Sequence, residues 1–351
     1  MRRRRNPGRW GRAMVAWAAV AFLGSQLGLN VYMEARHPEV YDPEYRDRLA
    51  VLRERTRDLP DLPLLLVVGS SRVMTDFRPE ELPPMPTPEG SWVLPFNLSH
   101  GGSGPLLNLV MLRRVLRDGF SPRWVVVEVV PPLLSAPDRA TALRLAQARD
   151  LPVLARYASG GELYGRYLRE RLKAGYEHRD AFFRQCSSRS DRPGDRWDSF
   201  PLAPLGGPAI IPHSDAGPEE VRRLTAQVRG QYFAGLQRLE VHPVSDRALR
   251  ELIELCRQRQ IGVVLLLTPE SSEFRGWYPP TALRVVGDYC RGLSREYAVP
   301  LVDARGWLPD DAFTDGHHVT GRGATEFTLR LGRVVLQPLA DGRLRAGMVS
   351  P

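Results

Sequence analysis

Hydrophobic residues gather along the chain in five short runs that are almost entirely apolar. These runs span Leu64–Val68, Trp92–Leu98, Trp124–Val130, Ile261–Leu267 and Val299–Val302. A strand buried on both faces of a sheet has this unbroken pattern, whereas a half-buried strand alternates between apolar and polar positions. The sequence therefore predicts five buried strands.

Helical patterns separate most of these runs. Apolar residues recur at helical spacing over Leu106–Arg117, Ser245–Arg259, Thr281–Tyr297 and Thr325–Leu336. Strands that alternate with helices indicate an α/β, doubly wound fold with a parallel sheet. We expect a flavodoxin-like, five-stranded parallel sheet in the order 2-1-3-4-5, in which the strand order reverses between strands one and three.

The stretch 133–244 interrupts this alternation. It holds helical segments around Ala140–Ala158 and Leu163–Phe183, followed by a region rich in Pro, Gly, Ser and Asp that reaches about Gly217. Because it is too long to be one loop, we predict a helical insertion that forms a cap or lid over the sheet edge.

An uncharged segment of 21 residues, Ala13–Met33, lies close to the N-terminus. At about 1.5 Å per residue it would span a hydrocarbon core of about 30 Å. Arginines precede it, which places the N-terminus in the cytoplasm and the rest outside, as in a signal anchor. A cleaved signal peptide competes, but the segment ends in Asn30-Val31-Tyr32 without a small-x-small site. A buried core helix also competes, but the flanking arginines argue against it.

Composition and charge exclude some classes of function. The net charge of +9 includes six arginines of the N-terminal tail, at positions 2, 3, 4, 5, 9 and 12, so the body is mildly basic and we expect no nucleic-acid partner. Cys186, Cys256 and Cys290 are odd in number and far apart. Their spacing suggests neither a zinc site nor a redox pair, and it does not fix the compartment.

These patterns predict the following organisation. Residues 1–12 form a basic cytoplasmic tail, 13–33 the anchor and 34–62 a stalk or helix. The α/β domain comprises 63–132 and 245–340, with the insertion at 133–244 and a tail at 341–351.

Three polar segments follow predicted strands and so meet at the carboxyl edge of the sheet, where ligands bind in open parallel sheets. They are Gly69–Arg72, Asn97–Gly104 and Phe313–His318. Each has a structural explanation on its own, because serine and aspartate cap helices and glycines make turns. Together they supply a hydroxyl, a base for it and a carboxylate to orient the base.

The chain resembles the SGNH (GDSL-like) hydrolase superfamily in these segments. The resemblance rests on a strand followed by Gly-Ser-Ser, an Asn-x-x-x-Gly-Gly block and a late Asp-x-x-His before the last helix. Ser70 stands where the superfamily usually has aspartate. This form looks like the membrane-anchored envelope branch, which includes proteins of alginate O-acetylation and teichoic-acid D-alanylation. The resemblance covers roughly Leu64–Val130 and Ile261–Leu336.

The resemblance implies roles for particular residues. Ser71 would be the nucleophile, His318 its base and Asp315 the carboxylate that orients the imidazole. The backbone N–H groups of Ser71 and of Gly102, or of Gly101 if the block slips by one residue, would bind the oxyanion. We expect His317 to face solvent or substrate, and we expect no cofactor and no metal. A metalloenzyme that uses Asp315 and both histidines is a rival hypothesis, although no third ligand has convincing spacing.

One block departs from the superfamily. Its third block normally offers an asparagine that donates to the oxyanion, but here the strand ends in Val129-Val130-Pro131-Pro132. Loss of one such donor costs about 10²–10³ in turnover, so Asn97 or His100 would have to substitute, or catalysis would be slow or lost. The buried strand also contains Glu128, which we expect either to pair with an arginine such as Arg72 or Arg275 or to lie at an exposed strand end.

We predict a single-pass membrane protein whose C-terminal domain lies in the periplasm or on the cell surface. Its function would be that of a serine O-acyl esterase or acyltransferase acting on an acylated envelope glycan or lipid, with a membrane-bound protein as an acyl donor. Candidate substrate-binding residues line the same edge: Arg72, Asn97, His100, Glu270, Arg275 and His317. The alternative is a non-catalytic envelope scaffold or glycan-binding protein that keeps the fold.

Overall fold

A computed structural model gives the structure of the chain and describes residues 7–36, 41–177, 202–211 and 213–349. The chain divides into two compact units, of which one comprises Met1–Pro43 with Leu143–Arg192 and the other Glu44–Ala142 with Pro193–Pro351. We describe each unit by itself.

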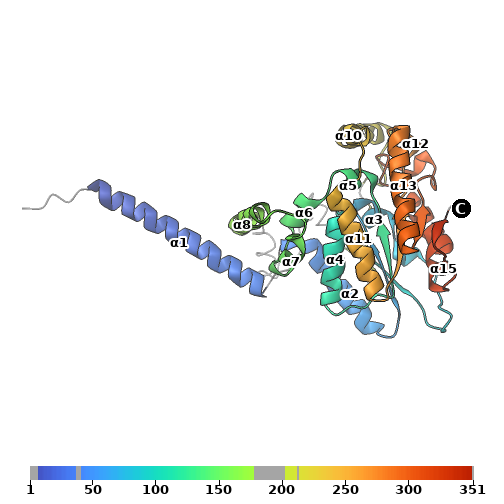
Figure 1. The fold of residues 1–351 in the computed structure, drawn as a ribbon, viewed down its shortest axis with the longest axis horizontal. Coiled ribbons are helices and arrows are strands. Elements are labelled where there is room, and N and C mark those ends of the chain that lie inside the picture. Colours follow the sequence, from blue (N-terminus) through green and yellow to red (C-terminus); the bar gives the residue numbers. More distant parts are fainter. Residues whose placement is uncertain (1–6, 37–40, 178–201, 212, 350–351) are drawn as a thin grey trace, which may run out of the picture. The chain divides into compact units, whose positions relative to one another are not determined.

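The larger unit is built on one parallel sheet (Figure 1). Its strands are β1 (Leu64–Val68), β2 (Leu94–Asn97), β3 (Trp124–Glu128), β4 (Gly262–Leu267), β5 (Pro300–Asp303) and β6 (Gly347–Val349). They lie in the order β2-β1-β3-β4-β5-β6, and all neighbours pair in parallel. The predicted five-stranded order is confirmed, and β6 adds a short edge strand that we had assigned to the C-terminal tail.

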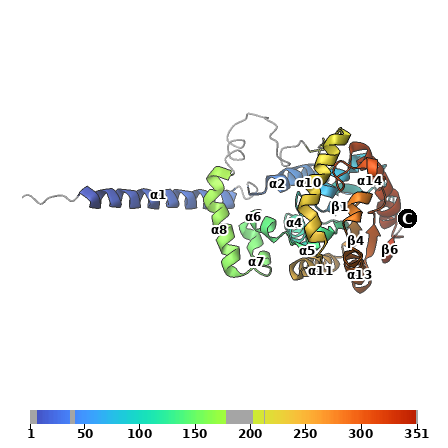
Figure 2. The same cartoon turned by 90° about the horizontal axis from the view of Figure 1, so that it is seen from above.

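Helices cover both faces of this sheet, as the apolar strand sequences require. On one face, α3 (Ser71–Asp76) and α14 (Gly321–Leu331) pack on a core that includes Val67, Val126 and Val264. On the other, α4 (Pro105–Arg117) and α11 (Pro243–Gln258) lie side by side, and α13 (Pro280–Tyr297) follows. Figure 2 shows α11 and α13 on the opposite side of the strands from α14.

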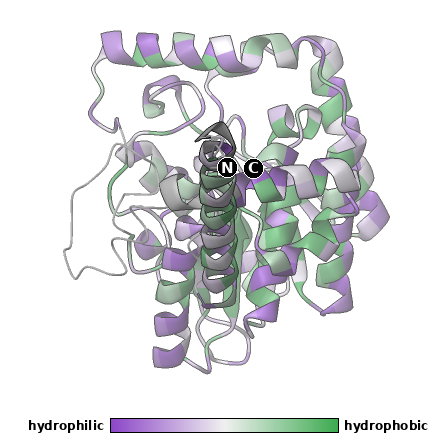
Figure 3. Ribbon diagram, turned by 90° about the vertical axis from the view of Figure 1, so that its left-hand side faces the viewer, coloured by the Kyte–Doolittle hydropathy of each residue, from purple (hydrophilic) through white to green (hydrophobic). Residues whose placement is uncertain are grey.

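Further helices of this unit complete the layers. They are α2 (Pro43–Asp58), α5 (Pro131–Ser135), α6 (Arg139–Arg144, whose last two residues belong to the smaller unit), α10 (Pro218–Leu236), α12 (Ser272–Gly276) and α15 (Gln337–Ala340), with short turns η2 (Pro79–Glu81), η5 (Asp310–Ala312) and η6 (Gly332–Leu336). Figure 3 shows hydrophobic residues on the central strands, whereas the surrounding helices alternate between hydrophobic and hydrophilic positions.

The smaller unit consists of helices. They are α1 (Pro7–Arg36), η3 (Ala148–Asp150), α7 (Leu151–Leu154) and α8 (Gly160–Glu177). Within α1, Trp10–Arg36 is 27 residues long with a mean hydropathy of 1.5, and only 6% of its most apolar window is buried. Helix α1 is therefore long and apolar enough to cross a membrane.

Candidate active site

The turn after β1 places Ser71 at the first position of α3. Ser70 caps this helix, because its side-chain oxygen accepts a hydrogen bond from the Arg72 N–H at 3.2 Å. The N–H groups at the start of a helix have no partner within the helix. In the described chain the Ser71 N–H has no hydrogen-bond acceptor, so it can serve a ligand.

Glu128, at the end of β3, holds the turn after β1 in place through a hydrogen bond. It is buried, and its Oε2 accepts a hydrogen bond from the Ser70 N–H at 2.5 Å while its Oε1 accepts one from the Thr268 hydroxyl at 2.8 Å. The expected pairing with Arg72 or Arg275, or position at an exposed strand end, is wrong. A main-chain donor and a hydroxyl satisfy the carboxylate instead, which no local pattern could indicate.

The loop before α14 brings the other two predicted triad members to Ser71. His318 Nε2 lies 3.0 Å from Ser71 Oγ, and His318 Nδ1 lies 2.7 Å from Asp315 Oδ2. The other oxygen of Asp315 accepts hydrogen bonds from the backbone N–H groups of His317 and His318 at 3.1 and 2.8 Å. The loop thus fixes the carboxylate, and the carboxylate fixes the imidazole. These distances are those of a serine, base and carboxylate relay.

In Asp315 and His318, charge interactions and hydrogen bonds together shift the pKa further than burial does. Burial favours neutral Asp315, but the two histidines and the hydrogen bonds from His318 hold the pKa of that carboxyl well below its ordinary range. Burial also disfavours charged His318, yet the charge and hydrogen bond of Asp315, with a contribution from Asp76, raise the pKa of His318 above 6.5. The site therefore stabilises the imidazolium that forms when a base takes a proton from serine.

Asp76 connects α3, which carries Ser71, to the loop that carries His318. It is fully buried at the end of α3, and its Oδ1 accepts hydrogen bonds from the Thr75 hydroxyl at 2.8 Å and the Val319 N–H at 3.3 Å. Burial raises the pKa of Asp76 to about 7. Because Val319 follows His318, this contact couples the positions of serine and base. Sequence reasoning missed Asp76, since nothing in the local pattern marks it.

His317 lies in an aromatic cluster. Its side chain is buried, and its ring centroid lies 5.4 Å from both Tyr232 and Phe274 and 4.2 Å from His318. Burial lowers the pKa of His317 well below 6.5 and so favours the neutral ring. We expect His317 to face solvent or substrate; exposure to solvent is wrong because the ring is buried, and contact with substrate stays a prediction. Tyr232 of α10 contacts this ring from within the stretch 133–244 that the sequence predicts as an insertion.

The same three residues are the ones a metalloenzyme would use. Ligand atoms of Asp315, His317 and His318 lie within 4.8 Å of one another. Both ring nitrogens of His318, however, already lie within hydrogen-bond distance of Asp315 and Ser71. This use of both nitrogens favours the serine interpretation over a metal site.

The Asn97–Gly104 block provides one free backbone donor and several structural contacts. The Gly101 N–H donates to Glu44 Oε1 at 3.1 Å, so it is committed to α2. Gly102 has a φ of +69° and its N–H has no acceptor in the described chain, which leaves this donor free to bind a ligand. His100 Nε2 lies 3.3 Å from Glu44 Oε2, which ties its ring to the same helix.

Asn97 has a structural role. Its side-chain amide donates to the carbonyls of Val73, Met74 and Phe77 at 3.0, 3.3 and 2.8 Å, and its oxygen accepts from the Ser99 N–H. These carbonyls belong to the end of α3, so Asn97 caps the nucleophile helix at its C-terminus. The amide is thus occupied by the protein and does not point free into the site.

Arg72 and Glu270 form a buried ion pair beside the triad. Arg72 Nη1 lies 3.0 Å from Glu270 Oε1, and both side chains are almost fully buried, at 3% and 0% exposure. The Tyr278 hydroxyl donates to the same oxygen at 2.8 Å, and the guanidinium lies over the Phe274 ring at 4.9 Å. Arg275 donates to the backbone carbonyls of Glu270 and Arg305. These predicted substrate-binding residues therefore have protein partners.

Glu270→Ala should lower the free energy of unfolding by about 3–5 kcal/mol, because it leaves the Arg72 charge buried and unpaired. Urea unfolding of the full chain in detergent, followed by tryptophan fluorescence, measures this. Glu273→Ala on exposed α12 is the matched control and should change stability by less than about 0.5 kcal/mol. An unchanged midpoint for Glu270→Ala would show that the pair does not stabilise the site.

The third block offers no side-chain donor where the superfamily has asparagine. Helix α5 begins at Pro131 directly after Val130, and neither Pro131 nor Pro132 has an N–H. These two positions therefore supply neither a side-chain donor nor a backbone N–H.

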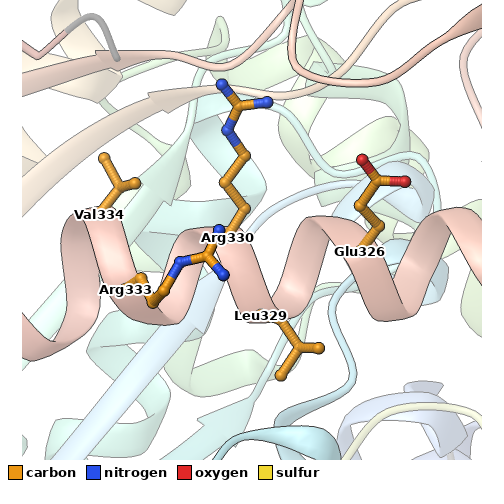
Figure 4. A pocket seen from close by; sticks show the side chains of 5 residues that line it. All are labelled: Glu326, Leu329, Arg330, Arg333 and Val334. Carbon is orange, nitrogen blue, oxygen red and sulfur yellow. The ribbon is translucent and has the colours of Figure 1, made fainter.

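The larger unit also has a surface pocket whose lining does not include Ser71, Asp315 or His318. Figure 4 shows that it is lined by Glu326, Leu329, Arg330, Arg333 and Val334, all from α14 and η6. None of the triad residues lines it, and it contains no arrangement of nucleophile and base.

Comparisons with known proteins add the following. A protein-family model matches residues 228–339, less than half of the chain, and so does not assign the family. No curated protein sequence matches. The chain is similar to a Bacteroides fragilis NCTC 9343 crystal structure described as an acylhydrolase, at 11% identity and a TM-score of 0.35, over 82% of this chain and 95% of that one.

A second solved structure, a GDSL-like lipase from Bacteroides thetaiotaomicron VPI-5482, is similar at 10% identity and a TM-score of 0.35, over 82% of this chain and 96% of that one. The strand order and the parallel pairing of β1 to β6 establish the fold.

Proposed function

We propose that this chain is a membrane-tethered serine O-acyl esterase or acyltransferase of the SGNH kind. The observation that carries the proposal is the continuous contact from Asp315 through His318 to Ser71, with 2.7 and 3.0 Å between the paired atoms. A serine hydroxyl at neutral pH needs an adjacent base, and that base needs an orienting carboxylate. The site supplies all three at the carboxyl end of β1, where open parallel sheets bind ligands.

Each residue of the site has a defined role in the proposed mechanism. Ser71 Oγ attacks an ester carbonyl while His318 Nε2 takes the hydroxyl proton, and Asp315 holds the Nδ1 proton and stabilises the imidazolium. The N–H groups of Ser71 and Gly102 bind the oxyanion. His318 then protonates the leaving alcohol as the tetrahedral intermediate collapses to an acyl-serine.

The acyl-serine decides between the two activities. Attack by water, with His318 again as base, releases an acid and makes the protein an esterase. Attack by a hydroxyl of a glycan or lipid passes the acyl group on and makes it a transferase. The resemblance to the envelope branch supports an acylated envelope substrate, and a membrane tether suits an acyl donor that is itself a membrane protein.

The membrane location is part of the proposal. Helix α1 has the length and hydropathy of a membrane span, and arginines precede it in the sequence. The positive-inside rule then directs the N-terminus to the cytoplasm and the larger unit to the periplasm or cell surface.

A fluorophosphonate probe tests the proposed nucleophile, because only an activated serine is labelled. The wild-type chain should be labelled and Ser71→Ala should not. Ser70→Ala is the matched control, since it removes the adjacent hydroxyl and should leave labelling in place. Labelling that survives in Ser71→Ala but disappears in Ser70→Ala would assign the nucleophile to the neighbouring residue.

A non-catalytic scaffold is the second candidate, and one observation favours it. Pro131 and Pro132 stand where the superfamily places an oxyanion donor, so the site has fewer donors than its active relatives. A folded wild-type chain that resists the probe would support this reading. The chain would then keep the fold to bind an envelope glycan or a protein partner.

A further inference from the structure

Helix α8 of the smaller unit exposes an apolar strip that no described part of the unit covers. Tyr164 and Leu168 are 55% and 54% exposed. They are four residues apart, so they lie one above the other on the same side of the helix. Leu163, by contrast, is fully buried, so α8 uses a different side to pack on its own unit.

Exposed arginines occupy the helix surface outside this strip. At 100° per residue, Arg166 lies opposite Tyr164 and Leu168, and Arg169 lies about 100° from Leu168. Among the described residues Arg166 has one long contact, 3.9 Å from the half-buried Glu162. A helix with an aromatic and aliphatic strip beside exposed arginines has the composition of one that lies in a membrane interface.

Buried polar contacts attach α8 to the C-terminal end of α1. The Asn30 amide donates to the Arg171 carbonyl at 2.7 Å, and Arg171 Nη2 lies 2.9 Å from Glu34 Oε2. The Arg171 guanidinium lies over the rings of Tyr41 and Tyr167, at 3.5 and 4.0 Å. Arg171 is only 4% exposed, so these contacts lie in the packed interior of the unit.

This attachment lies near the C-terminal end of the apolar segment of α1. Residues 30–34 are the positions where the uncharged segment gives way to charged residues, and therefore where α1 would leave a bilayer. Figure 2 shows α8 lying crosswise to α1 at that end. If α1 spans the membrane, a helix that crosses it at this level lies in the plane of the membrane surface.

We propose that α8 is an interfacial helix that rests on the phospholipid surface where α1 emerges. Tyr164 and Leu168 enter the boundary between headgroups and acyl chains, and Arg169, one residue after Leu168, reaches lipid phosphates, whereas Arg166 lies on the opposite side of the helix and faces away from the bilayer. The proposal rests on the membrane location of α1 proposed above, but not on catalysis. It gives the tether a second contact, which restricts how the smaller unit can tilt.

Photocrosslinking in the full chain tests this. Benzoylphenylalanine is placed at one position at a time in protein reconstituted into vesicles of phosphatidylethanolamine and phosphatidylglycerol. Tyr164→benzoylphenylalanine and Leu168→benzoylphenylalanine should form lipid adducts at least several-fold more than Arg166→benzoylphenylalanine, the matched control on the polar side. Leu23→benzoylphenylalanine, in the middle of α1, reports membrane insertion. All four side chains are exposed, so these changes leave the folded core intact.

The outcomes separate this proposal from the others. Adducts at Leu23 without adducts at 164 and 168 overturn it, and so do adducts at 164 and 168 that contain protein instead of lipid. Absence of lipid adducts at Leu23 overturns both the span and the interfacial helix. Fluorophosphonate labelling of the same preparations reads the serine site independently, so a failure of catalysis leaves a positive lipid result unaffected.

Discussion

Ser71→Ala and His318→Ala should each lower the turnover of a simple aryl acetate by on the order of 10⁶-fold, and the double variant should be no worse than either. The reason is that His318 Nε2, 3.0 Å from Ser71 Oγ, has nothing to activate once the hydroxyl is gone. Members of one relay act as a unit, so their losses do not add. Steady-state kinetics of the three variants against wild type measure this.

Ser70→Ala is the control for these variants. It removes the capping oxygen of α3, so it should cost about 1 kcal/mol of stability while most turnover remains. His317→Ala makes a poor control, because it would leave a cavity in the cluster that His317 forms with Tyr232 and Phe274. Losses that simply multiply between Ser71→Ala and His318→Ala would contradict a shared relay.

Asp315→Asn should lower the same turnover by on the order of 10⁴-fold, less than loss of the nucleophile or base. The amide is nearly the same size as the carboxyl but can present a donor to His318 Nδ1, which favours the wrong imidazole tautomer. Far-UV circular dichroism should stay unchanged, because the loop geometry is preserved.

The pH profile of this variant adds a second signature. Asp315 raises the pKa of His318 above 6.5, and the base works only when neutral, so wild-type kcat/KM should fall as pH drops through that raised pKa. Removing the carboxylate charge lowers this pKa, and the acidic limb should move to lower pH. An acidic limb that stays in place in Asp315→Asn would mean that another group controls it.

The sheet could be predicted from the sequence because its signal is local. Runs such as Leu64–Val68 are apolar at every position, and a short run of this kind is typical of a strand that is buried on both faces. The edge strand β6 has only three residues, Gly347–Val349, and too short a run gives no periodicity to detect. The approach of Ser71, Asp315 and His318 could also be predicted, since each follows a strand or precedes a helix at the same edge.

The partners of buried charges could not be predicted in the same way. Glu44 of α2 accepts from Gly101 N–H, and Glu270 pairs with Arg72, across 57 and 198 residues of sequence. Such contacts depend on how distant elements pack, which no local pattern encodes. His317 illustrates the same limit, because a residue in an irregular loop has no helical or strand phase to show whether it faces the core.

The contact between Glu128 and the turn after β1 limits how the sequence can vary. A Cβ atom on Gly69 would lie 2.5 Å from Glu128 Oε2 and 2.7 Å from its Cβ, distances that no side chain tolerates. Because the Cβ of Glu128 is one of these close atoms, a shorter side chain at position 128 would still clash, and only glycine there would remove the contact. Glycine at position 128 would in turn release the Ser70 N–H that Glu128 now accepts. Variation at position 69 is therefore restrained by a residue at the end of β3, far away in the sequence.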